Sequence, residues 1–142
     1  MKINFIMACG LSWLLSAVTT PALGMDRLAA LSLVESGNND AAIGRAGEVS
    51  RYQIKPRLWE KCGCPWPLHA RTNPQAARCV AQAIMRGRCA NFEHQFHRPP
   101  NDFEYYILWN APAQIGKPGL AVSARANRFS NLLRPWPGES QS

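Results

Sequence analysis

One glutamate in this sequence has the surroundings of a catalytic acid. Glu35 ends a predicted helix over residues 26–36, on the same side as the apolar residues Leu28 and Leu31. Apolar neighbours and the negative end of the helix dipole both disfavour a carboxylate, so they raise the pKa of its side chain. A carboxylic acid that stays protonated near neutral pH can donate its proton to a leaving-group oxygen. This is the first requirement for cleaving a glycosidic bond.

Two further carboxylates follow in a loop expected over residues 38–50. Hydrolysis needs a second carboxylate, whereas a single acid suffices when a hydroxyl of the sugar itself attacks. Glu48 is the candidate for that second catalytic group. The alternative is that it braces the loop, through Arg45, Arg51 or backbone N–H groups. Asp40 is the other possible second carboxylate, but it follows two asparagines and is expected to form a turn.

Four short motifs occur in a fixed order along the chain. They are Glu35-Ser36, the segment from Gly47 to Gln53-Ile54, Asn73-Pro74, and Trp109-Asn110-Ala111-Pro112. From about residue 26 to 133 the chain thereby resembles the soluble lytic transglycosylase-type domains of the lysozyme-like superfamily, which are related to goose-type lysozymes. The resemblance implies a mainly α, lysozyme-like α+β fold.

The resemblance also implies a reaction on peptidoglycan glycan strands. Glu35 would protonate the oxygen between N-acetylmuramic acid and N-acetylglucosamine, and would then take the proton of the C6 hydroxyl as a 1,6-anhydro ring closes. Ser36 would support the acid or contact substrate, while Gln53 and Asn110 would line the sugar groove. The candidate substrate-binding residues are Ser36, Tyr52, Gln53, Trp109 and Asn110. The family's reaction uses no metal and no cofactor.

The chain departs from the family pattern at several positions, namely Glu48, Ser50, Trp109 and Pro112. Trp109 replaces a tyrosine that hydrogen-bonds near the acid, and an indole can donate a hydrogen bond but cannot accept one. We therefore expect Tyr52 or Tyr105 to supply the phenol instead. The departures leave open a non-catalytic glycan-binding domain, or an inhibitor or effector that binds another protein.

Helical periodicity dominates the remaining segments. Helices are predicted over residues 26–36, 56–61, 73–87, 101–110 and 120–133. Gly37 and Gly87 are the expected terminators of the first and third helices, and Phe92 and Phe96 suggest a short turn after the latter. Tyr52 to Ile54 is expected to be a short extended piece. Together these segments predict one compact helical domain over residues 25–134 and a flexible tail over 135–142.

The first 24 residues have the order of a secretory signal. Lys2 precedes an apolar run over residues 3–18, and small residues near Gly24 provide a cleavage site. We therefore expect a secreted or periplasmic monomer with no stable membrane insertion after cleavage. A formal net charge of +7 suits an anionic polymer. Because no nucleic-acid-binding motif is present, nucleic acid is not an expected partner.

Four cysteines remain once Cys9 leaves with the signal. They are Cys62, Cys64, Cys79 and Cys89. An even number of cysteines in an oxidising compartment predicts two disulfides that join the first two to the last two, in either order. A zinc site is the less favoured alternative, because Cys-x-Cys is not the usual zinc spacing.

Overall fold

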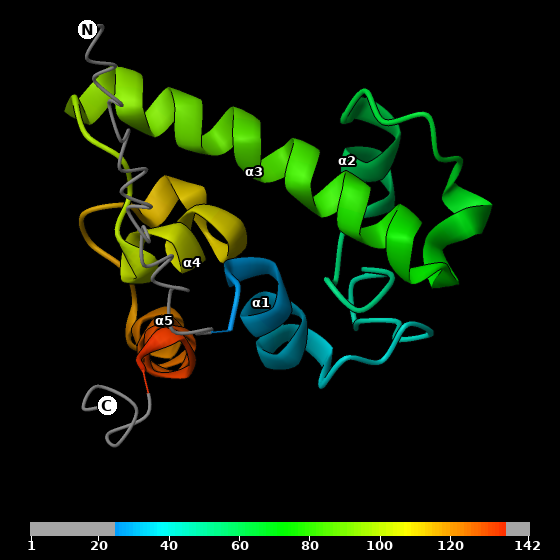
Figure 1. Cartoon of the computed structure of the whole chain (residues 1–142), viewed down its shortest axis with the longest axis horizontal. Helices are drawn as coiled ribbons and strands as arrows, with labels where there is room; N and C mark the ends of the chain where they lie inside the picture. Colours follow the sequence, from blue (N-terminus) through cyan, green and yellow to red (C-terminus); the bar gives the residue numbers. More distant parts are fainter. Residues whose placement is uncertain (1–24, 136–142) are drawn as a thin grey trace, which may run out of the picture.

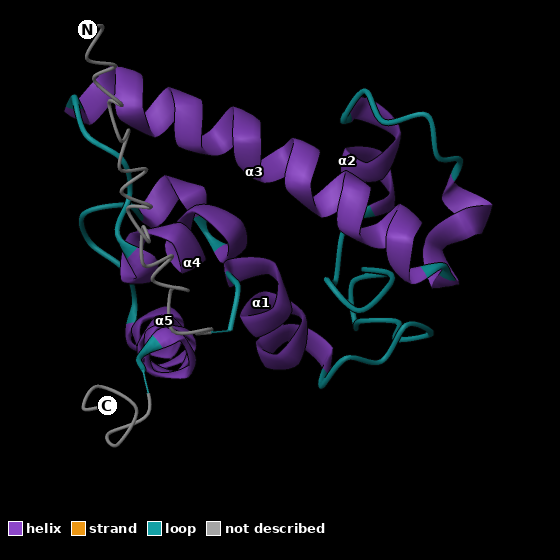
Figure 2. Ribbon diagram, in the orientation of Figure 1, coloured by secondary structure: helices purple, strands orange, loops and turns teal. Residues whose placement is uncertain are grey.

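The computed structural model describes residues 25–135, so the predicted signal segment and all but the first residue of the predicted tail lie outside the described residues. The described part is mainly helical, which confirms the predicted fold class (Figures 1 and 2). Its elements are α1 (Arg27–Ser36), α2 (Pro56–Lys61), η1 (Leu68–Thr72), α3 (Pro74–Phe96), α4 (Asp102–Asn110), η2 (Pro112–Gln114) and α5 (Leu120–Leu133), where η marks a 3₁₀-helix. None of the described helices is long and apolar enough to cross a bilayer.

Short polar side chains begin three of the helices. Asp26 accepts hydrogen bonds from two N–H groups at the start of α1, and Asn73 does the same before α3. Asn101 and Glu104 form a reciprocal capping box at the start of α4. Gly37 ends α1 in the left-handed conformation, with a φ of 65°. These local rules explain why the predicted bounds of α1 and α4 agree closely with the structure.

The predicted end of the third helix at Gly87 is wrong. α3 continues to Phe96 and ends at His97, which takes a left-handed φ of 55°. A glycine inside a helix costs only about 1 kcal/mol relative to alanine, and tertiary contacts beyond Gly87 offset this. Arg88 hydrogen-bonds α4, and Phe92 is 3% exposed.

The small β region shrinks to two isolated antiparallel bridges, Ile43–Val49 and Val49–Ile54, and no longer strand forms within residues 25–135. The extended piece predicted for Tyr52 to Ile54 is wrong, because reciprocal 2.9 Å backbone hydrogen bonds between Val49 and Ile54 close a tight turn. Ser50 and Gln53 take left-handed φ values of 69° and 52° in this turn.

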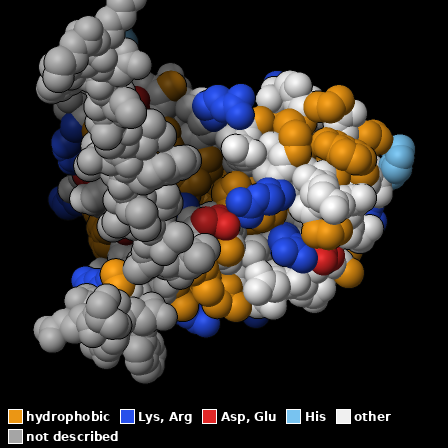
Figure 3. Space-filling view, viewed as in Figure 1, with side chains coloured by type: hydrophobic (Ala, Val, Ile, Leu, Met, Phe, Trp, Pro, Cys, Tyr) orange, Lys and Arg blue, Asp and Glu red, His pale blue; other side chains and the backbone are white. Residues whose placement is uncertain are grey.

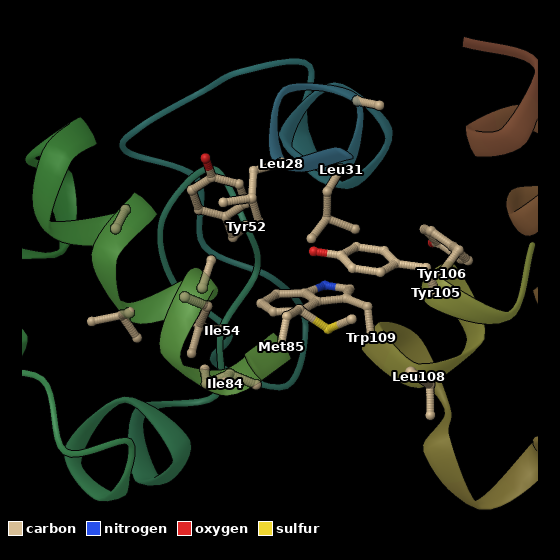
Figure 4. Packing of buried hydrophobic residues seen from close by; sticks show 14 of the residues in the cluster. Leu28, Leu31, Tyr52, Ile54, Ile84, Met85, Tyr105, Tyr106, Leu108 and Trp109 are labelled. Carbon is tan, nitrogen blue, oxygen red and sulfur yellow. The ribbon is translucent and has the colours of Figure 1, made fainter. Parts of the chain in front are cut away.

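The core lies where α3 crosses α1 and α4, while α5 packs against both α1 and α4 (Figure 1). Its largest fully buried side chains include Trp59, Tyr52, Tyr106, Phe129 and Leu31. Phe129 of α5 packs against both tyrosines of α4, with ring centroids 5.8 Å from Tyr105 and 5.6 Å from Tyr106. Figure 4 shows Leu31 of α1 pointing toward the Tyr106 ring, with Trp109 on the other side of that ring. This packing joins α1 and α4 through α5, which contacts both.

The two predicted disulfides stay a prediction, since the four cysteines are present as free thiols in the described part of the chain. The sulfur atoms of Cys64 and Cys79 lie 2.9 Å apart, so a bridge between these two stays a prediction. Cys89 lies ten residues after Cys79 on α3, which is about 15 Å along the helix at the usual rise. The pairing of Cys89 with Cys62 or Cys64 stays a prediction. Within residues 25–135 no group of three or more potential ligands is placed to hold a metal.

Replacement of Gly87 by alanine tests the continuous α3. A Cβ at Gly87 would meet no atom within 4 Å, so Gly87→Ala should raise the free energy of unfolding by about 0.5–1 kcal/mol. Gly37→Ala is the matched control, because its left-handed φ disfavours a Cβ and should lower stability by about 1 kcal/mol. Urea unfolding followed by circular dichroism measures both. A destabilised Gly87→Ala variant would show that the helix does break there.

Candidate active site

The Glu35 side chain lies on the last turn of α1 and is partly buried. The hydroxyl of Tyr106, a fully buried residue of α4, donates a 2.6 Å hydrogen bond to Oε1 of Glu35. In Figure 4 the Tyr106 hydroxyl points from α4 toward α1. The phenol expected from Tyr52 or Tyr105 thus comes from Tyr106, which corrects that prediction.

Burial raises the pKa of Glu35 above its ordinary value, and this effect outweighs two opposing ones. The Tyr106 hydrogen bond and the positive charge of Arg125 both lower the pKa, while the nearby charge of Glu48 raises it further. Burial also raises the pKa of Tyr106, and the charge of Glu35 adds to this. Tyr106 is therefore a hydrogen-bond donor throughout the physiological pH range.

The Glu35 carboxyl borders an open cleft of about 630 Å³. The cleft is lined by the end of α1, the loop from residue 44 to 55, α2, the middle of α3, the end of α4 and one residue of α5. Five of the predicted site residues line it, namely Glu35, Glu48, Gln53, Trp109 and Asn110. The structure thus brings together side chains that are as much as 75 positions apart in sequence, counted from Glu35 to Asn110.

Glu48 is held by the backbone of its own loop. Its Oε2 accepts a 3.1 Å hydrogen bond from the N–H of Ala46, which is one of the brace roles expected for it. A Cβ at Gly44 would collide with the carboxylate of Glu48 and the amide oxygen of Gln53. The missing side chain at Gly44 therefore leaves the space in which both polar groups sit.

Asp40 lies away from the cleft, because Arg51 holds it in a bidentate ion pair with distances of 2.5 and 2.7 Å. This hydrogen bonding lowers the pKa of Asp40. The arrangement agrees with the expected turn-forming role. It also explains why Arg51 is not the partner of Glu48.

Two predicted substrate-binding residues do not line the cleft. The hydroxyl of Ser36 donates to the carbonyl of Arg51 at 2.8 Å and accepts from the N–H of Asn39 at 3.1 Å, so it ties α1 to the following loop. Tyr52 is 2% exposed and packs edge-on against Trp109, with ring centroids 6.4 Å apart. Its hydroxyl points away from Trp109 in Figure 4. Both residues support the wall of the cleft from behind.

Arg88 fixes the end of α4, where Trp109 and Asn110 enter the cleft. Its Nη1 donates to the carbonyls of Leu108 and Trp109 at 2.7 and 2.6 Å, and its guanidinium lies 5.8 Å from the centre of the Trp109 ring. A cation at the C-terminal end of a helix is favoured by the helix dipole. Trp109 is thereby held at 7% exposure, while Asn110 is exposed in the cleft.

The sequence analysis did not identify three residues of this site, Tyr106, Arg88 and Arg125. Tyr106 precedes Trp109 and Asn110 by three and four positions, so helical spacing places all three on one face of α4 and is a usable signal. Arg88 was hidden by the helix end predicted at Gly87. No sequence signal distinguishes Arg125 from Arg128, the other basic residue of α5.

The arrangement can supply an acid with a raised pKa, a phenol that orients it, and polar side chains along an open cleft. Within the described residues, the other carboxylate on this cleft is Glu48. No protein-family model, curated protein or solved structure matches the chain.

Proposed function

We propose that this protein is a peptidoglycan lytic transglycosylase that cleaves the bond between N-acetylmuramic acid and N-acetylglucosamine, with Glu35 as its acid and base. The observation that carries the proposal is the Glu35 carboxyl, whose pKa is raised by burial and which the Tyr106 hydroxyl orients at the edge of an open cleft. The four motifs that resemble this family supply the choice of substrate. The predicted secretory signal suits a substrate outside the cytoplasmic membrane.

In the first step the proton of Glu35 moves to the glycosidic oxygen. The bond from the muramic acid C1 to that oxygen breaks, and its electron pair leaves with the N-acetylglucosamine. Positive charge develops at C1 and the ring oxygen, while Glu35 becomes a carboxylate. Tyr106 stays bonded to that carboxylate, and the positive charge of Arg125 stabilises it.

In the second step the carboxylate of Glu35 takes the proton of the C6 hydroxyl as its oxygen bonds to C1. The product is a 1,6-anhydro sugar, Glu35 is protonated again, and no water is consumed. Because the attacking group belongs to the substrate, one carboxyl group completes both steps. Gln53 and Asn110 line the cleft and can hydrogen-bond the sugars, and the edge of Trp109 offers an apolar contact.

Hydrolysis by a lysozyme-type mechanism is the second candidate. The observation that favours it is Glu48, which lines the same cleft and lies near enough to Glu35 to raise its pKa. A carboxylate there could activate water. We favour the transglycosylase because the Glu48 carboxylate already accepts a hydrogen bond from its own loop.

Replacement of Glu35 by glutamine should abolish lysis of purified cell walls, with a loss of about 10³-fold or more, because no proton can be donated. The same variant should be more stable than the wild type at neutral pH. The raised pKa means that the folded protein favours the neutral acid, so wild-type stability falls as pH rises through the folded-state pKa.

Urea unfolding of both proteins from about pH 4 to about pH 7 measures this difference. The advantage of Glu35→Gln should grow as the pH increases. Equal wall lysis by the two proteins would exclude Glu35 as the acid. A stability difference that did not depend on pH would contradict the raised pKa.

Replacement of Tyr106 by phenylalanine should move the alkaline limb of the pH–activity profile to higher pH. The hydrogen bond from Tyr106 favours the carboxylate form of Glu35, so its loss raises the pKa of Glu35 further. Glu35 then stays protonated up to a higher pH. The maximal rate should fall about tenfold, because the acid is weaker and less well oriented. Tyr105→Phe is the control from the same helix and should leave the limb in place. A shift to lower pH in Tyr106→Phe would refute this role.

Replacement of Glu48 by glutamine separates the two reactions. Mass analysis of the digested fragments should give anhydro ends for the wild type and for Glu48→Gln, with the rate within about tenfold. Fragments of the wild type that carried added water, and that vanished with Glu48→Gln, would assign the hydrolase instead.

A further inference from the structure

Three cysteines come together where the chain leaves α2 and passes α3. The thiol of Cys62 donates a 3.0 Å hydrogen bond to the carbonyl of Trp59 and accepts one of 3.4 Å from the N–H of Cys64. The sulfur of Cys64 lies 2.9 Å from the sulfur of Cys79, on the second turn of α3. Cys62, Cys64 and Cys79 are called the thiol cluster below. Its members come from the end of α2, the following loop and α3.

The loop that carries Cys64 has few other ties to α3. Gly63 takes a left-handed φ of 78°, and the prolines at positions 65 and 67 have no N–H to donate. Within residues 25–135, the contact between Cys64 and Cys79 is the one hydrogen-bond contact that joins residues 62–67 to α3. The thiol cluster therefore sits at the point where this loop could be fixed to the long helix.

The thiol cluster lies near the surface, where a reagent in solution can reach it. Each of its three cysteines is partly exposed. Figure 3 shows hydrophobic side chains, a class that includes proline and cysteine in that view, gathered on the surface over α2 and the following loop. These thiols are therefore candidates for reaction with an external disulfide.

α2 connects the thiol cluster to the cleft. Leu58 of α2 and Lys55, which precedes it, both line the cleft, while Trp59 is 1% exposed in the core. The 3₁₀-helix η1 packs against both α2 and α3. A covalent bond between the loop and α3 would therefore fix the helix that forms part of the cleft wall.

We propose that Cys64 and Cys79 are an oxidation site, at which a disulfide compound such as oxidised glutathione forms a bridge that clamps the α2 segment onto α3. The two sulfur atoms need to approach by only about 1 Å to reach the usual bond length of about 2.05 Å. Cys62 is assigned no bond in this bridge, because its thiol is directed at the Trp59 carbonyl. The inference goes beyond the proposed function and does not depend on it.

Two successive thiol–disulfide exchanges form the bridge. Burial, and then the hydrogen-bond contact with Cys79, raise the pKa of Cys64 to about 12, so Cys64 stays a thiol at neutral pH. The sulfur of Cys79 therefore loses its proton first and attacks oxidised glutathione, which gives a mixed disulfide and one glutathione thiol.

Cys64 then attacks the Cys79 sulfur of the mixed disulfide. The proton of Cys64 passes to the second departing glutathione, and the bond between Cys64 and Cys79 closes. The two cysteines lose two electrons and two protons in total, and one oxidised glutathione becomes two reduced ones. Excess reductant reverses both steps.

Oxidation of the reduced protein by glutathione disulfide, quenched with a maleimide and followed by mass analysis, tests the site. We expect the loss of two hydrogens and of two alkylatable thiols, with Cys79 in the bridge. Cys62 and Cys64 fall in one tryptic peptide, because no lysine or arginine separates them, so variants must distinguish them. A bridge that does not include Cys79 would overturn the proposal.

The matched variants are Cys62→Ser and Cys64→Ser, which each remove one thiol from the cluster. Cys62→Ser should form the bridge at a rate within about twofold of the wild type, and Cys64→Ser should form it at least about tenfold more slowly. Cys89→Ser is a second control from further along α3 and should behave as the wild type. Equal rates in Cys62→Ser and Cys64→Ser, or loss of the bridge in Cys62→Ser, would overturn the assignment.

Comparison of oxidised and reduced wild type tests the clamp without any mutation, so the folding of a variant is not at issue. Because the bridge closes a loop of 15 residues, oxidation should raise the Tm by about 10 °C. Amide hydrogen exchange in α2 should slow about tenfold, while exchange in α5 stays unchanged. Neither readout involves cell-wall cleavage, so failure of the proposed function would leave this test intact. A bridge that forms without slowing exchange in α2 would overturn the clamp.

Discussion

The hydrogen bond from Tyr106 to Glu35 is the interaction on which the rest of the site depends. A carboxylate at the C-terminal end of a helix faces the carbonyl groups of the last turn, so both burial and the helix dipole oppose its charge. The phenol reaches it from a helix about seventy residues later, at 2.6 Å. Phe129 of α5 packs against the Tyr106 ring and fixes its direction. Residues of α1, α4 and α5 therefore fix the geometry of the hydrogen bond between Tyr106 and Glu35.

The loop after α1 also packs against α4, through Tyr52 and Trp109. Its tight turn between Val49 and Ile54 sends Tyr52 into the core, where the ring packs against Trp109. The preceding residues then lie at the cleft, with Glu48 and Gln53 in the space beside Gly44. Arg88 holds the other side of Trp109. The loop, α3 and α4 thus meet around one indole. Here it is a packing centre, and the phenol comes from one turn earlier.

Local sequence signals correctly predicted the helix ends that depend on nearby side-chain and backbone hydrogen bonds. Asp26 and Gly37 fix the ends of α1 through their own backbone and side-chain bonds, and the helix over residues 120–133 was predicted with its observed bounds. The helix end predicted at Gly87 was wrong because contacts between α3 and α4 hold the helix together beyond this glycine. Local sequence rules do not include such contacts. The choice of Tyr106 over Tyr105 depends on how α4 is rotated against α1 and α5. The placement of Cys79 and Cys89 on one continuous helix was not predicted, because the sequence suggested a helix end between them.

Several locally unfavourable features gather around the same cleft. Ser50 and Gln53 both hold left-handed φ values, a conformation that side chains other than glycine adopt at a cost of about 1 kcal/mol or more. Glu35 is partly buried at the end of a helix that disfavours its charge, and Arg88 is partly buried without a carboxylate among its hydrogen-bond partners in the described residues. Each feature lowers stability unless surrounding contacts offset it, and the core formed by α1, α3, α4 and α5 provides those contacts. Sequence choices that oppose local stability and converge on one surface are typical of a functional site. Because Glu35, Gln53 and Arg88 line the cleft from three separate segments of the chain, their convergence is independent of any one motif. It supports a binding or catalytic role for this cleft whatever its ligand.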